Sequence, residues 1–205
     1  MRTVPATVLA DPSYLVPAAA PGETGIAWLR SAASRFSNGP THARRRALVE
    51  HLLAAIDTAA LRQPYEGHPV GRLAEALGAT DSDLTADLTA DVRTAAAAYQ
   101  TGAPAADDAV ERLVAAFGGA HDEPTAARIA LLVQACDATA ALIERSRTRP
   151  VEDVLRDDPP VPATRRVTPD GEVVLVSLAG APFGAGPRAC PGREHALALV
   201  AGARR

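Results

Sequence analysis

The chain has 205 residues, 47% of them hydrophobic, and a formal net charge of −3, which predicts one domain, residues 1–205, with a real hydrophobic core. The mildly acidic balance argues against nucleic-acid binding, and no apolar run of about 18 residues predicts a membrane span. The first 10 residues hold one arginine and no long apolar region, so we expect no secretory signal. Two cysteines are too few for a disulfide scaffold, so the expected location is cytoplasmic.

Hydrophobic periodicity predicts that most of the chain before residue 150 is helical. The first 25 residues are rich in Pro and Ala and predict a short extended piece followed by a loop. Thr41, just after a Gly-Pro pair, is the expected N-cap of the second helix. The predicted helices cover residues 26–36, 41–56, 70–79, 81–99, 105–117 and 122–145.

After Pro150 the pattern changes from helical to mixed. A short helix over 151–156 is followed by a hairpin whose turn is Pro169-Asp170-Gly171 and whose second strand covers 173–178. A Gly- and Pro-rich loop then leads to a last helix over 193–203. The predicted fold class is therefore mainly α with a small β element.

The loop over residues 183–192, with the sequence FGAGPRACPG, carries the chemistry. Cys190 lies two residues before Gly192 at the start of the last helix, where free amide groups favour a thiolate. A soft thiolate is a good axial ligand for haem iron. The alternative interpretation is a glycine-rich turn with an ordinary small buried cysteine.

This loop resembles the haem-binding loop of the cytochrome P-450 superfamily, FxxGxRxCxG, at every specified position: Phe183, Gly186, Arg188, Cys190 and Gly192. The resemblance implies haem b (iron protoporphyrin IX) as cofactor and Cys190 as the metal ligand. It also implies that Arg188 pairs with a haem propionate and that Phe183 shields the sulfur.

The segment THARRRALV resembles the superfamily's helix in which a His and an Arg four residues later face the propionates. His42 and Arg46 fit these positions and share one helix face. Arg44 and Arg45 are expected to be solvated surface residues. A capping or surface histidine is the alternative for His42.

The segment VEDVLRDDPPVPATRRV resembles the superfamily's ExxR helix and the strand after it. The acid of that motif falls on Asp153, one methylene shorter than glutamate, and its arginine on Arg156. Glu152 is the neighbouring acid, but it lies four residues before Arg156 and so does not fit the spacing of the ExxR motif. Arg165 fits a third propionate contact, and the alternative is that Arg165 and Arg166 are surface residues of an edge strand.

The segment LLVQACDATAALI resembles the long distal helix with its [AG]Gx[DE]T core. Its acid falls on Asp137, its threonine position on Ala138, and Gln134 stands where a small residue contacts haem. Thr139 comes one residue late; a shifted register would recover the threonine but lose the acid. Cys136 is expected to be a core residue of this helix.

The resemblance as a whole implies a minimised cytochrome P-450-like fold that lacks part of the distal lid helices, since the chain has about half the usual family length. It implies a haem-thiolate oxidoreductase of the monooxygenase or peroxygenase type that oxidises a small organic substrate, with a ferredoxin-type electron donor. Asp137, Thr139 and Gln134 are the candidate catalytic residues. The alternative is a catalytically silent haem-binding protein that serves as a sensor, carrier or pathway interaction partner, and a third possibility is a domain that has lost haem.

Overall fold

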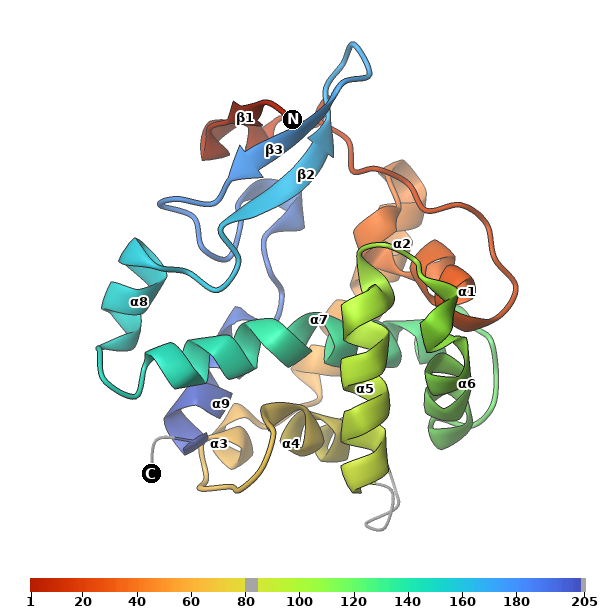
Figure 1. The fold of residues 1–205 in the computed structure, drawn as a ribbon, viewed down its shortest axis with the longest axis vertical. Helices are drawn as coiled ribbons and strands as arrows, with labels where there is room; N and C mark the ends of the chain where they lie inside the picture. The colour runs from red at the N-terminus through yellow and green to blue at the C-terminus, as the bar shows by residue number, and fades with distance from the viewer. Residues whose placement is uncertain (80–84, 204–205) are drawn as a thin grey trace.

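The computed structural model describes residues 1–79 and 85–203, which form a mainly helical fold with a small sheet at one end (Figure 1). The α-helices of the described residues are α1 (Gly25–Ala32), α2 (Gly39–Ala54), α3 (Thr58–Leu61), α4 (Pro69–Ala76), α5 (Thr85–Tyr99), α6 (Asp107–Ala116), α7 (Glu123–Arg145), α8 (Val151–Asp157) and α9 (Arg193–Ala203). The strands are β1 (Thr3–Val4), β2 (Ala163–Val167) and β3 (Val173–Ser177). Short 3-10 turns are η1 (Ala6–Ala10), η2 (Ser34–Phe36), η4 (Pro104–Ala106) and η5 (Gly186–Arg188).

The predicted helices and the predicted hairpin are confirmed. The first predicted helix divides into α1 and η2, and the one over 105–117 begins with η4 and continues as α6. The helix predicted from residue 81 is seen as α5 from Thr85, because 81–84 lie outside the described residues. In α7, Asp122 caps the first turn by accepting a hydrogen bond from the Thr125 N–H at 2.8 Å.

The predicted N-cap of the second helix was wrong. The helix α2 begins at Gly39, and Asn38 is the extended residue before it. Pro40 fits the first turn because its fixed φ is already helical and no intrahelical partner is needed there. The Asn38 side chain does not cap α2; it accepts from the Val16 N–H at 3.0 Å and donates to the Val16 carbonyl at 2.9 Å.

One α-helix and one strand of the described chain were not predicted individually. The four-residue helix α3 and the two-residue strand β1 are too short for periodicity to indicate them. β1 pairs in parallel with β3, while β2 pairs with β3 in antiparallel register, giving the order β1-β3-β2. The N-terminal segment therefore lies beside strands that come more than 150 residues later.

The helix α7 lies at the centre of the helical part, packed against α2, α4, α5 and α9. Ile129, Leu132 and Cys136 on its inner face are fully buried, which confirms Cys136 as a core residue. Each large apolar side chain buried in this way stabilises the fold by about 1.5–3 kcal/mol. By length and mean hydropathy α7 would suit a membrane span, but core helices pass the same test, and 56% of its most apolar window is buried.

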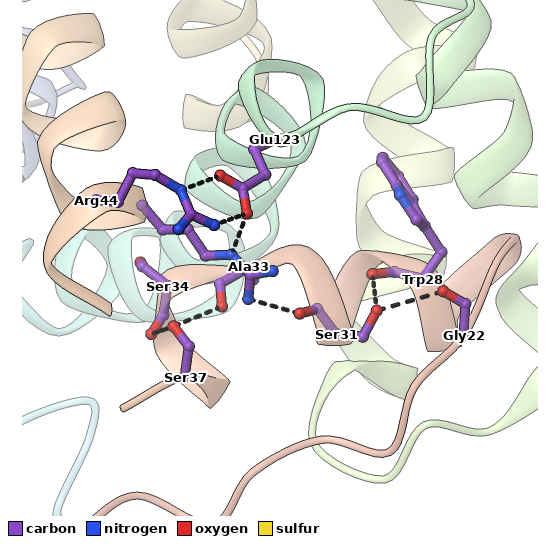
Figure 2. Close-up of polar contacts among 9 residues, drawn as sticks. Gly22, Trp28, Ser31, Ala33, Ser34, Ser37, Arg44 and Glu123 are labelled. Carbon is purple, nitrogen blue, oxygen red and sulfur yellow. Dashed lines mark hydrogen bonds and ion pairs between the residues drawn. The ribbon is translucent and has the colours of Figure 1, made fainter. Parts of the chain in front are cut away.

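A polar junction joins α1, α2 and the start of α7 (Figure 2). Arg44 donates to Glu123 at 2.6 Å, and Arg45 donates to Glu123 at 2.8 Å and to the Ser31 carbonyl at 2.6 Å. The expectation that Arg45 is solvated was wrong, because its side chain is only 16% exposed. Hydrogen bonds and charge from Arg44, with the same from Arg45, outweigh desolvation and hold the pKa of Glu123 at about 2.

Candidate functional site

The cysteine loop connects β3 to α9 and is closed by its own backbone. The Cys190 N–H donates to the Phe183 carbonyl at 2.7 Å, and the Ala189 N–H donates to the Gly186 carbonyl at 3.0 Å across η5. The Phe183 ring lies 5.5 Å from the guanidinium carbon of Arg193 and is half-buried. Cys190 is thus held at the end of a defined turn, three residues before α9 begins.

Gly186 is required by the packing of this loop. Its φ of 66° lies in the left-handed region, and a Cβ there would stand 2.9 Å from the Ala10 Cα and 3.0 Å from the Leu9 carbonyl oxygen. The loop therefore packs directly against η1. Gly192 is less crowded, since its Cβ would meet only the Leu53 Cδ1 at 4.0 Å.

The Cys190 residue is exposed, yet protein atoms around it raise the pKa of its thiol by desolvation. The Gly192 N–H and the charge of Arg46 act in the opposite direction, as the position before α9 suggests. The net direction differs from the sequence-based expectation of a favoured thiolate, because desolvation outweighs the amide and the cation. Desolvation therefore favours the protonated thiol over the thiolate in this structure.

Arg188 ties the cysteine loop to the N-terminus of α2. Its Nη2 donates to the Ser37 carbonyl at 2.6 Å and to the Asn38 Oδ1 at 2.9 Å. Burial, then the charges of Arg188 and Arg46, lower the pKa of His42. The structure thus brings His42, Arg46 and Arg188 together, as the resemblance implies.

In β2 the positions of the two arginines differ from the sequence-based expectation. Arg165, the predicted propionate contact, is exposed, whereas Arg166 is only 5% exposed. The Arg166 Nη1 donates to the Arg165 carbonyl at 2.8 Å and to the Thr164 Oγ1 at 3.2 Å. Burial, then the charges of Arg188 and Arg35, lower the pKa of Arg166 to about 10. Arg166 is therefore the better placed of the two for a buried anion, and its interpretation as a surface residue was wrong.

Arg35 in η2 is a further cationic residue that sequence analysis did not single out. Its guanidinium carbon lies 5.8 Å from the Phe36 ring centroid, and burial lowers its pKa, with Arg165 contributing in the same direction. No motif indicated it.

Together the remaining residues form what we call the arginine cluster: Arg35, His42, Arg46, Arg166 and Arg188. Within this cluster, Arg46 alone has an acidic partner within 4 Å among the described residues, Glu50 at 2.7 Å. A buried charge without a counter-ion is costly, so a cluster of this kind is suited to an anionic ligand.

Of the three candidate catalytic residues of α7, Thr139 lies on a different helix face from Gln134 and Asp137. Gln134 is exposed and donates to the Ala130 carbonyl at 3.0 Å, and Asp137 is exposed as well. Thr139 is 4% exposed and belongs to the buried face, while Ala138 is half-buried. Residues two apart on a helix lie on nearly opposite sides, so the structure does not bring Asp137 and Thr139 together.

The predicted acid–arginine pair of α8 is present. Arg156 donates to Asp153 at 2.6 Å, and it also donates to Asp157 at 2.9 Å. The Arg156 side chain is 63% exposed, so the pair contributes little to stability.

Comparison with known proteins bears on the fold. Neither a protein-family model nor a curated protein matches the sequence. One chain in the crystal structure of P450BioI in complex with hexadec-9Z-enoic acid ligated acyl carrier protein matches with a TM-score of 0.65 and 17% identity, over 96% of this chain and 80% of that chain. At this identity the likeness is one of fold alone. The described residues thus adopt a mainly helical fold, with a small mixed sheet, that resembles a chain from a P450 complex.

Proposed function

We propose that this protein binds one haem b, with the Cys190 thiolate as axial ligand and the arginine cluster on the propionates. The single observation that carries the proposal is the cluster itself: Arg166 and Arg188 are desolvated without an acidic partner among the described residues, next to the loop of Cys190. The resemblance of that loop to the haem-binding motif and the resemblance of the fold to a P450 chain support it.

The residues fit the group that the proposal requires. A haem carries two propionates, and each is suited to charge-assisted hydrogen bonds from a guanidinium. Cys190 is an exposed residue, and the raised pKa of its thiol would keep the sulfur protonated until a metal ion binds. Arg188 would hold one propionate while its Nη2 stays on Ser37 and Asn38, with His42 and Arg46 beside it and Arg166 on the other propionate.

Haem loading is tested by titration of the cofactor-free protein with hemin. Wild type should take up one equivalent and retain it through gel filtration. Arg188→Ala and Arg46→Ala should each lose haem faster, because an unpaired buried propionate costs about 1–3 kcal/mol. Arg44→Ala is the matched control on the same helix, since Arg44 is bound to Glu123. Equal losses from all three variants would contradict the assigned face of α2.

The bound group would supply oxidative chemistry on a small organic substrate, of the monooxygenase or peroxygenase type. Among the residues of α7, Ala138 replaces the expected hydroxyl, and Thr139 is buried on another face than Asp137. Ordered proton delivery from the protein is therefore weak, which favours hydrogen peroxide, an oxidant that brings its own electrons and protons. Asp137 remains the candidate proton donor through water, and Gln134 a hydrogen-bond donor.

The oxidant is tested by comparing product formation with hydrogen peroxide and with a surrogate ferredoxin and its reductase. The peroxide route should dominate in wild type, and Ala138→Thr should raise the reductive route relative to it. Dominance of the reductive route in wild type would contradict the proton-delivery reasoning and support a ferredoxin-type partner.

A catalytically silent haem protein is the second candidate. The observation that favours it is the same separation of Asp137 from Thr139 on α7. Haem retention without turnover by either oxidant, across a panel of substrates, would support this second candidate.

A further inference from the structure

The side chain of Asn38 lies where three segments that are far apart in the chain meet: the N-terminal segment, the start of α2 and the cysteine loop. We propose that Asn38 is a positioning residue of the haem site, because its amide holds the Arg188 guanidinium in the orientation that meets a propionate. This inference rests on the proposed function, and it adds a residue that acts through Arg188 rather than on haem itself.

The amide of Asn38 is itself held in place. Its Oδ1 accepts from the Val16 N–H at 3.0 Å, and its Nδ2 donates to the Val16 carbonyl at 2.9 Å. Val16 is buried, and Leu15 before it exchanges two backbone hydrogen bonds with Val167 of β2, at 2.8 and 3.0 Å. Because Val16 cannot shift without breaking these bonds, the Asn38 Oδ1 is an acceptor with a fixed position.

The same oxygen holds Arg188. The Arg188 Nη2 donates to the Asn38 Oδ1 at 2.9 Å and to the Ser37 carbonyl at 2.6 Å, and no hydrogen bond joins its Nη1 or Nε to another described residue. Both two-pronged edges of a guanidinium include Nη2, so Arg188 presents Nη1 and Nε to a ligand one at a time. Without Asn38 the guanidinium would be freer to turn, and the ligand would have to order this long side chain itself.

The backbone of Asn38 links this point to the other residues proposed for the propionates. Its carbonyl accepts from the His42 N–H at 3.3 Å where α2 begins, and Arg46 follows His42 by one turn on the same helix face. An alanine at position 38 keeps that carbonyl but has no amide. The variant Asn38→Ala therefore removes the contact to Arg188 and leaves the backbone link to His42 intact.

The test is a double-mutant cycle on the rate of hemin loss, measured as transfer of hemin from the loaded protein to an excess of apomyoglobin. Asn38→Ala should lose hemin roughly tenfold faster than wild type, which is the effect of one lost hydrogen bond to a charged group. In the Arg188→Ala background the same change should add less than about twofold, because no guanidinium is left to position.

Hemin dimethyl ester separates positioning from a general loss of structure. Its esterified propionates carry no charge for a guanidinium to bind, so Asn38→Ala should change the rate of ester loss by less than about twofold. Ser31→Ala is the matched control, since the Ser31 Oγ also makes two hydrogen bonds, to the Trp28 and Gly22 carbonyls at 2.9 and 3.4 Å, and none to Arg188. It should keep hemin loss within about twofold of wild type.

The outcomes separate this inference from the proposed function. If wild type binds hemin but Asn38→Ala retains it equally well, or speeds its loss as much without Arg188 or with the ester, the positioning role is overturned and the haem proposal stands. Hemin loss from Ser31→Ala as fast as from Asn38→Ala would overturn it too. If wild type takes up no hemin, both proposals fail. Far-UV circular dichroism checks that each variant is folded, and Asn38→Gln, whose amide lies one methylene farther out, takes the place of an unfolded Asn38→Ala with the same expected results.

Discussion

Replacing Arg166 with methionine is expected to change two free energies in opposite directions. In the cofactor-free protein the guanidinium is 5% exposed and has no acidic partner within 4 Å among the described residues. Methionine keeps most of the apolar stem without the charge. We expect Arg166→Met to be more stable than wild type without hemin and to bind hemin more weakly.

The magnitude follows from the pKa of Arg166, which burial lowers from 12.5 to about 10. That shift corresponds to a charge penalty of about 3 kcal/mol, since one pKa unit is worth about 1.4 kcal/mol. The two hydrogen bonds to Thr164 and Arg165 contribute about 1 kcal/mol each and are lost in the variant. The net gain in the free energy of unfolding is therefore about 1–2 kcal/mol.

The dependence on pH has a definite sign. The folded-state pKa is lower than the unfolded one, so the penalty is complete at every pH below about 10 and fades as the group deprotonates above that value. At pH 7 the full difference should be present.

The assay is urea unfolding at pH 7, with and without hemin. Arg165→Met is the matched control, because Arg165 is exposed in the same strand, and it should stay within about 0.5 kcal/mol of wild type. With hemin, Arg166→Met should lose affinity by about tenfold or more, since a charge-assisted hydrogen bond contributes about 1.5–3 kcal/mol. Destabilisation of the hemin-free variant by more than 1 kcal/mol would refute the reasoning.

Three further predictions concern the fold around the site. Gly186→Ala should lower the free energy of unfolding in urea by about 2–4 kcal/mol, because the new Cβ adds a clash with η1 to the strain at positive φ. Gly184→Ala has only the strain and should lower it by about 1–2 kcal/mol, and equal losses would contradict the close approach of Gly186 to η1. Glu123→Gln should lower the free energy of unfolding by about 1–3 kcal/mol at pH 7. This difference from wild type should shrink as the pH falls from 4.5 towards 2 and the wild-type carboxylate protonates, and a difference that does not change with pH would show that the charge plays no part. Tyr99→Phe should leave the free energy of unfolding unchanged or raise it by about 1 kcal/mol, because the buried Tyr99 hydroxyl has no hydrogen-bond partner among the described residues. A loss of more than about 1 kcal/mol would show that the hydroxyl does form a hydrogen bond in the folded protein.

The long helices could be predicted from the sequence because their apolar spacing and end residues agree. In α7, Asp122, Glu123 and Pro124 open a helix that ends with Arg145, as a helix dipole favours. The start of α2 could not be predicted in the same way, since the Asn38 side chain is used by Val16 and Arg188 rather than by its own helix. The hydrogen-bond partners of the Asn38 side chain therefore come from segments that are distant in the sequence.

The candidate site was predictable where a motif fixes it and not where packing decides. Cys190, Arg188, His42 and Arg46 come from local patterns, and the structure gathers them. Arg166 was missed because the alternation of side chains along β2 indicates that Arg165 and Arg166 point to opposite faces of the sheet. It does not indicate which of the two faces is buried by the rest of the chain. The direction of the Cys190 pKa was missed because burial by the surrounding chain cannot be seen in the loop sequence.

The central claim is that Cys190 is the axial thiolate ligand of a haem. The most direct measurement is the absorption spectrum of the hemin-loaded protein after reduction and addition of carbon monoxide. A red-shifted Soret band, typical of a thiolate-ligated haem, is the predicted result, and Cys190→Ala should abolish it while the far-UV circular dichroism stays unchanged. A protein that stays colourless after incubation with hemin, or a red-shifted band that survives Cys190→Ala, would contradict the claim.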